Sequence, residues 1–355
     1  MSIPTEPIGS IPRSPELQAA VQGLSEGRVS EAEVRSLQDA AIRDTIERFE
    51  ATGSPVITDG EQAKPSFATY PIHGMKDLAP DGVTIPFADG HTRQLPRLTA
   101  GPFQYQVYAA TYLESAQRYA HVPVKQPVIA ASALSLLYPQ DGIDGYPRET
   151  FLGDLAAEAE TDIRACLRRG AYKVQMDFTE GRLSIKLDPS KQILRSFIDL
   201  NNRVLERFSE EERRKIGVHT CPGGDQDSTH SLDVDYAELL PMLFELKAGT
   251  FYIQLASEPD RPRILGIIKE HAPPDARIFV GVIDPIDPRI ETPDEVRDRV
   301  LEAAEYLALE RLGTCDDCGF SPFGDDTSTT RDTAFAKIRA RVEGTVLAAR
   351  ELGVA

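Results

Sequence analysis

Short apolar runs alternate with helical patterns along most of the chain. The apolar runs lie at residues 6–13, 54–61, 122–132, 171–177, 215–221, 249–257, 277–284 and 306–315. Between them, apolar residues recur at helical spacing, as at 149–170, 191–213, 235–249 and 292–307. Eight strand–helix units in a chain of 355 residues predict an α/β fold, a single (β/α)8 TIM-type barrel spanning 1–355, with a doubly wound sheet as the alternative.

Two segments extend the simple repeat. Residues 30–53 predict an N-terminal helical extension, with Ser30 as its N-cap and Gly53 as its stop. Residues 62–120, after the second predicted strand, are longer than a simple crossover. We interpret 62–120 as an elaborated loop that forms a lid over one face of the barrel.

Polar side chains recur at the carboxyl ends of the predicted strands. These residues are Asp177, His219, Cys221, Gln254, Asp284 and Cys315. In a barrel, the carboxyl ends of the strands converge on one face, where active sites are built. The sequence therefore predicts that these side chains lie around one site.

The composition narrows the class of partner. Hydrophobic residues make up 41% and charged residues 27%, and 39 basic against 56 acidic residues give a net charge of −17. Such a surface repels phosphate backbones and anionic lipid, so we expect neither nucleic acid nor membrane as a partner. The first residues lack a secretion-signal pattern, and no apolar run has the length of a membrane span, so a cytoplasmic location is expected. The oligomeric state is left open.

Four cysteines are too few for a disulfide framework in a chain of this length. Cys166 lies in the helical pattern at 149–170 and is predicted to be a core residue. Cys221, Cys315 and Cys318 are close to Gly, Pro and Asp residues typical of turns, where metal ligands often lie.

His219 and Cys221 are two residues apart in a predicted strand, so both side chains can face one point. Cys318, expected on the same face, supplies a third ligand of the chemistry that zinc prefers. Three protein ligands with an open position are typical of catalytic zinc. Alternatively, Cys315 and Cys318 form half of a zinc knuckle or a redox pair, although no second cysteine pair completes a knuckle.

Six short motifs follow one another in the order of a known family. They are Ile8-Gly9-Ser10, Gly60-Glu61, Val174–Asp177, the pair His219 and Cys221, Asp284–Arg289, and Asp317-Cys318-Gly319. With these motifs the chain resembles the C-terminal catalytic barrel of the cobalamin-independent methionine synthase family. The resemblance runs nearly from end to end.

The resemblance implies a zinc-dependent methyl- or alkyltransferase that acts on a thiol. Ser10, together with Ile8 and Gly9, would bind the carboxylate of a homocysteine-like substrate, and Glu61 and Asp177 its ammonium group. Coordination to zinc removes the thiol proton, which makes the sulfur nucleophilic at neutral pH. The second substrate would be a small methyl or alkyl donor.

Three positions depart from the family pattern. Gln254 stands where the family has a zinc-binding glutamate, so Gln254 and Glu258, four residues on, are weaker candidate ligands. Phe178 replaces an acid, and Ile286 replaces the histidine expected to protonate the departing folate nitrogen. Most of the residues expected to bind and activate the thiol are therefore retained, whereas those expected to act on the folate differ.

These departures keep two further functions open. One is epoxide opening, as in the related epoxyalkane–coenzyme M transferases, with a coenzyme M-like thiol and a proton donated by Asp284, Asp287 or a tyrosine. Retention of Glu61 and Asp177 argues instead for a thiol that carries an ammonium group. The other is a zinc-binding barrel without catalytic activity.

Overall fold

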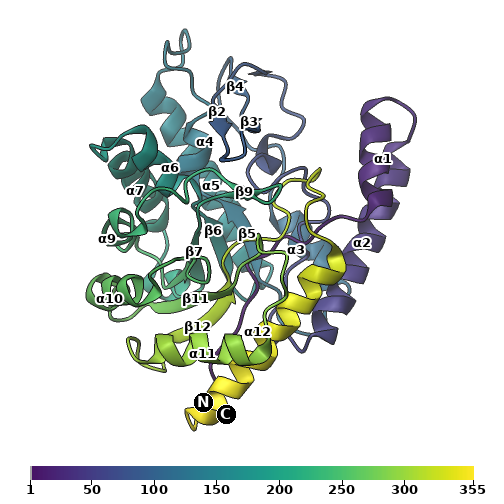
Figure 1. Cartoon of the computed structure of the whole chain (residues 1–355). Coiled ribbons are helices and arrows are strands. Elements are labelled where there is room, and N and C mark those ends of the chain that lie inside the picture. The colour runs from purple at the N-terminus through teal and green to yellow at the C-terminus, as the bar shows by residue number, and fades with distance from the viewer. Residues whose placement is uncertain (1) are drawn as a thin grey trace.

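Six parallel strands form the centre of the protein in the computed structural model, which describes residues 2–355. Their order is β12-β11-β10-β7-β6-β5 (Figure 1). The strands are β5 (Gln126–Ile129), β6 (Val174–Asp177), β7 (Ile216–Thr220), β10 (Thr250–Ile253), β11 (Arg277–Ile283) and β12 (Leu312–Asp316).

Two short extended segments complete the ring of eight. Thr5 forms a parallel bridge with Thr314 of β12, and Ile57 forms one with Val124, just before β5. The two segments join each other, since the Ile11 N–H donates to the Gly60 carbonyl at 3.0 Å. The predicted barrel is thus confirmed, but the full strands predicted at 6–13 and 54–61 are wrong: a single bridge lies at Thr5, just before the first range, and another at Ile57, within the second.

The helices lie around the strands, with the first of them packed against the second rather than on the strands (Figure 1). They are α1 (Pro15–Ser25), α2 (Glu31–Ala51), α3 (Ala110–Gln117), α4 (Ala131–Ser135), α5 (Arg148–Arg168), α6 (Glu180–Leu187), α7 (Gln192–Leu205), α8 (Glu210–Arg213), α9 (Leu240–Leu243), α10 (Arg261–His271), α11 (Pro293–Ala304) and α12 (Arg331–Glu351). The Ser30 side chain caps α2, as predicted, by accepting the Glu33 N–H. No helix within residues 2–355 is long and apolar enough to cross a membrane.

Two predicted elements differ from the structure. The helix predicted at 235–249 is limited to the short helices η2 (Tyr236–Glu238) and α9, and the strand predicted at 306–315 begins only at Leu312. Residues 62–120 contain η1 (Tyr70–Ile72), α3 and two small antiparallel pairs. One pair joins β1 (Leu78–Ala79) to β4 (Arg97–Leu98), and the other joins β2 (Thr84–Pro86) to β3 (Thr92–Gln94).

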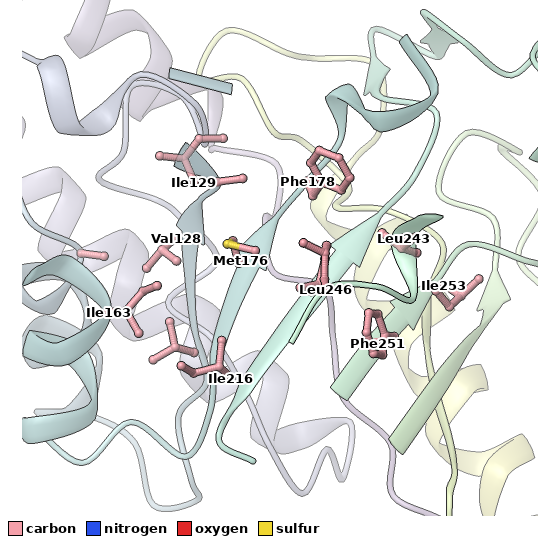
Figure 2. Packing of buried hydrophobic residues seen from close by; sticks show 14 of the residues in the cluster. Val128, Ile129, Ile163, Met176, Phe178, Ile216, Leu243, Leu246, Phe251 and Ile253 are labelled. Carbon is pink, nitrogen blue, oxygen red and sulfur yellow. The ribbon is translucent and has the colours of Figure 1, made fainter. Parts of the chain in front are cut away.

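The main hydrophobic core lies between the strands and the surrounding helices. Figure 2 shows Ile163 of α5 beside Val128 of β5, with Met176 of β6 close by. Cys166, also on α5, is fully buried in this core, as predicted. Burial of this apolar surface supplies the main driving force for folding.

A cluster of buried charged and polar side chains surrounds Glu6, in the first segment of the chain. Glu6 accepts a hydrogen bond from Lys173 Nζ at 2.8 Å and one from the Tyr252 hydroxyl, and Lys125 Nζ lies 3.7 Å away. All four side chains are buried. Because unpaired buried charges are costly, these partners fix the first segment within the barrel.

Candidate metal centre

His219, Cys221 and Cys318 lie together at the carboxyl ends of the strands. His219 is on β7, Cys221 follows that strand directly, and Cys318 follows β12. The two sulfur atoms are 3.1 Å apart, and the possible ligand atoms of all three residues lie within 4.8 Å of one another. All three side chains are buried.

A tight turn after β7 positions Cys221. Gly223 has φ +70°, and its N–H donates to Cys221 Sγ at 3.4 Å. A Cβ at Gly223 would lie 1.8 Å from His230 Nε2, so the turn requires glycine both for its conformation and for its space.

Asp177, on the neighbouring strand β6, holds the His219 ring. Asp177 Oδ1 lies 3.1 Å from His219 Nδ1 and accepts a second hydrogen bond, from Gln175 Nε2, at 2.7 Å. A histidine that binds a metal commonly donates its other ring N–H to a carboxylate in this way. Burial lowers the pKa of His219, but the hydrogen bond and charge of Asp177 outweigh it and raise the pKa overall.

The two cysteines have different proton affinities. Burial raises the pKa of Cys221, whereas the hydrogen bond from Cys221 is the main cause that lowers the pKa of Cys318. The pair therefore favours a thiolate on Cys318, and a thiolate is the form of cysteine that binds metal.

The weaker candidate ligands lie outside this group. Arg182 donates to Gln254 Oε1 at 2.9 Å and to Glu258 Oε1 at 2.7 Å, so both side chains are engaged with a buried cation. Cys315 lies in a separate buried cluster, with its sulfur 3.6 Å from the Phe279 carbonyl oxygen. Within residues 2–355, only His219, Cys221 and Cys318 form a group of possible metal ligands.

Asp317, which the motif contained but to which no separate role was assigned, organises the loop after β10. Its carboxylate accepts the N–H groups of Leu255, Ala256 and Ser257, each at 2.8 Å. The Asp317 carbonyl oxygen lies 3.3 Å from His219 Nε2. This single residue thus connects the loop after β10 to the metal-ligand group.

A cavity of about 950 Å³ opens on the metal-ligand group. It is lined by His219 and Cys318, by the candidate substrate residues Ile8, Gly9, Ser10, Glu61 and Asp177, and by Glu180. Asp284 and Asp287, the candidate proton donors, are not among its lining residues. Asp287 instead accepts the Arg289 N–H, at 2.9 Å.

The Ile8–Ser10 segment packs tightly against β6 and the loop that carries Cys318. The Ile8 carbonyl accepts Gln175 Nε2 at 3.0 Å, which links the segment to the amide that holds Asp177. A Cβ at Gly319 would lie 2.1 Å from Ser10 Oγ, so the residue after Cys318 must be glycine for this packing.

Glu61 is not free in this structure. Its carboxylate accepts a hydrogen bond from Lys64 Nζ at 2.8 Å, and both side chains are buried. Burial raises the pKa of Glu61, although the Lys64 ammonium acts in the opposite direction. The second expected ammonium site therefore already contains a cation from the protein itself.

The small β2–β3 hairpin contacts the loops that carry the metal ligands. Arg93 forms ion pairs with Asp225, in the loop after β7, at 2.5 Å, and with Asp325, in the loop after β12, at 2.8 Å. Phe87 packs edge-on against His230, with ring centroids 5.5 Å apart. These contacts place the 62–120 segment beside the cavity.

Comparisons of sequence and fold show which known proteins the chain resembles. The family described as "Cobalamin-independent synthase, Catalytic domain" matches residues 3–343. The chain belongs to this family. It is similar to the methionine synthase of Sulfurisphaera tokodaii, which is 22% identical over 360 residues, covering 99% of this chain and 94% of that protein.

The chain is also similar to part of a longer protein and, in fold, to a solved structure. A 5-methyltetrahydropteroyltriglutamate–homocysteine methyltransferase of Nitratidesulfovibrio vulgaris is 23% identical over 324 residues, covering 90% of this chain but only 39% of that protein. A B12-independent methionine synthase from Shewanella sp. W3-18-1, solved with selenomethionine, has a TM-score of 0.73 at 17% identity, with both chains fully covered. The chain is thus similar to methyltransferases of the methionine synthase family and shares their fold.

Proposed function

We propose that the protein is a zinc-dependent S-alkyltransferase, in which a substrate thiol is activated at the His219, Cys221 and Cys318 group. The observation that carries the proposal is this group of three buried donors at the edge of a large cavity. Zinc ligands lie about 2.0–2.3 Å from the ion, so donor atoms this close together can share one ion. Zinc, when bound, acidifies a thiol so that its sulfur is nucleophilic at neutral pH.

The chain's own residues would bind and orient the thiol. Ser10 and the Ile8–Ser10 backbone suit a carboxylate, and Asp177 Oδ2, which the two hydrogen bonds to Oδ1 leave free, suits an ammonium group. A homocysteine-like thiol is therefore the first candidate, and it agrees with the names of the relatives.

One observation favours a second candidate, a thiol without an ammonium group, such as coenzyme M. Lys64 neutralises Glu61, so the cavity offers one free carboxylate rather than two for a substrate cation. Ile286 also supplies no proton for a departing folate nitrogen. An epoxide or another alkyl donor would suit a thiol of this kind.

Metal analysis followed by crystal soaks tests the proposal. We expect one zinc per chain and, after separate soaks with homocysteine and coenzyme M, the sulfur of the true substrate at the open position of the metal. Thioether formation should stop when a chelator removes the metal. Zinc that binds at full occupancy without any change on addition of either thiol would contradict the proposed function and indicate a barrel that only binds metal.

A further inference from the structure

We propose that Glu180 is the general acid of the reaction, which protonates the leaving atom of the alkyl donor in the same cavity. The inference rests on the proposed S-alkyl transfer and adds the residue that supplies the proton. No sequence pattern indicated this role, because Glu180 lies outside the family motifs, two residues after Phe178.

The surroundings of Glu180 hold one of its oxygens and leave the other free. Glu180 begins α6, is 5% exposed and lines the cavity that contains His219 and Cys318. Ser132 Oγ donates to Glu180 Oε1, while Asn201 Nδ2 donates to Ser132 Oγ at 2.7 Å. The other oxygen, Oε2, is buried without any hydrogen-bond partner.

This pattern fits a neutral carboxylic acid with its proton on Oε2. Because Ser132 donates to Oε1, that oxygen acts as the acceptor, and the unpartnered Oε2 is the place for the acidic hydrogen. A buried carboxylate without a cation costs far more free energy than the neutral acid does.

The charges around Glu180 also favour the neutral form. No ion pair within residues 2–355 includes Glu180, in contrast to Glu61 and Glu258, which pair with Lys64 and Arg182. Burial raises the pKa of Glu180 to about 8, against the opposing effect of hydrogen bonds from Ser132 and the backbone, and the nearby negative charge of Asp177 raises it further. Ser132 on α4, which donates to Glu180, and Asn201 on α7, which donates to Ser132, are both uncharged.

The proposed step balances in atoms and charge. The thiol first releases its proton to solvent, and its sulfur then forms a bond to the donor carbon. The bond from that carbon to its nitrogen or oxygen breaks, and the electron pair stays on the heteroatom, which receives the proton from Glu180 Oε2. Glu180, now a carboxylate, is reprotonated from solvent.

The Glu180→Gln variant separates proton donation from shape, because glutamine is close in shape to the neutral acid. The parent and the variant would be compared, as zinc-loaded proteins and with both thiols, on methyltetrahydrofolate, epoxypropane and iodomethane. Iodide leaves without a proton, so iodomethane is the matched control. For whichever of the other two donors the parent uses, we expect the variant to be about 10²–10⁴-fold slower. With iodomethane, we expect little change.

The pH profile gives a second test. The parent's rate with the proton-requiring donor should fall as pH rises above about 8, as Glu180 loses its proton, and the variant should lack this fall. Infrared difference spectra of the metal-free protein should contain a protonated carboxyl band that disappears near the same pH. This band should be absent in Glu180→Gln.

The outcomes distinguish the two proposals. A parent that forms no thioether from any donor would overturn both the proposed function and the role of Glu180. An active parent with an equally active variant, a variant equally slowed with iodomethane, or the absence of a band that depends on Glu180 would overturn the role of Glu180 alone.

Discussion

Replacement of Asp177 tests how the protein holds His219, the histidine of the candidate metal-ligand group. The carboxylate makes two contacts through one oxygen, to His219 Nδ1 at 3.1 Å and to Gln175 Nε2 at 2.7 Å. Asp177→Asn can keep both contacts through its amide oxygen and removes only the negative charge. Asp177→Ala removes both contacts and leaves the His219 ring without its support.

The structure sets the expected size of both effects. Loss of a residue that orients a metal ligand typically weakens metal affinity 10–100-fold. We expect Asp177→Ala near the upper end, which corresponds to about 2.7 kcal/mol, and Asp177→Asn near the lower end, about 1.4 kcal/mol. The order of the two variants matters more than either value, because it separates geometry from charge.

Zinc affinity measured by competition with a coloured chelator provides the assay. Asp287→Ala is the matched control, because Asp287 lies in the loop after β11, outside the cavity lining, and this variant should bind zinc as the parent does. Parent-like zinc affinity in Asp177→Ala would refute the reasoning that Asp177 orients His219. An equal loss of affinity in Asp177→Asn and Asp177→Ala would show that the charge, rather than the orientation, dominates.

Three further predictions follow from the ligand group and its surroundings. Cys318→Ser should lose zinc on metal analysis, whereas Cys315→Ser should retain the parent's content, and the reverse result would contradict the assignment. Gly319→Ala should lower the free energy of unfolding by about 1–3 kcal/mol in urea titrations, because its Cβ would overlap the Ser10 hydroxyl; an unchanged midpoint would contradict this packing. Arg93→Ala should lower the free energy of unfolding by about 1–3 kcal/mol and speed zinc loss to a chelator, since it removes charged hydrogen bonds to both ligand loops. Zinc loss at the parent's rate would show that the hairpin does not stabilise the site.

Hydrophobic patterning predicted the barrel, because each buried strand appears as an apolar run and each covering helix has its own period. The strands predicted at 6–13 and 54–61 do not form, for local reasons. Pro7 and Pro12 lack the N–H that a strand ladder requires, and Gly60 and Glu61 have φ values of +66° and +56°, which end the second segment in a turn. Periodicity alone does not report either effect.

The ligand group was accessible from the sequence, since residue chemistry and strand-end position both indicated it. The sequence does not indicate whether each acidic side chain is protonated or paired with a cation. A glutamate can be buried as a neutral acid, as proposed for Glu180, or as a carboxylate paired with a cation, as Glu61 is with Lys64. Which of the two occurs depends on the side chains that the fold brings near it. The absence of Asp284 and Asp287 from the cavity lining likewise depends on the path of one loop.

Closure of the barrel has a consequence for synthesis on the ribosome. The first segment bonds to the last strand, and the Ile8 N–H and the Asp316 carboxylate it contacts are 308 residues apart. At about 5–20 residues per second, the first segment waits roughly 15–60 s for this partner. Near the end of that time, once β11 has emerged, its edge is unpaired until β12 adds, and such edges readily join other chains. The nascent chain is therefore most exposed to aggregation just before its last strand emerges.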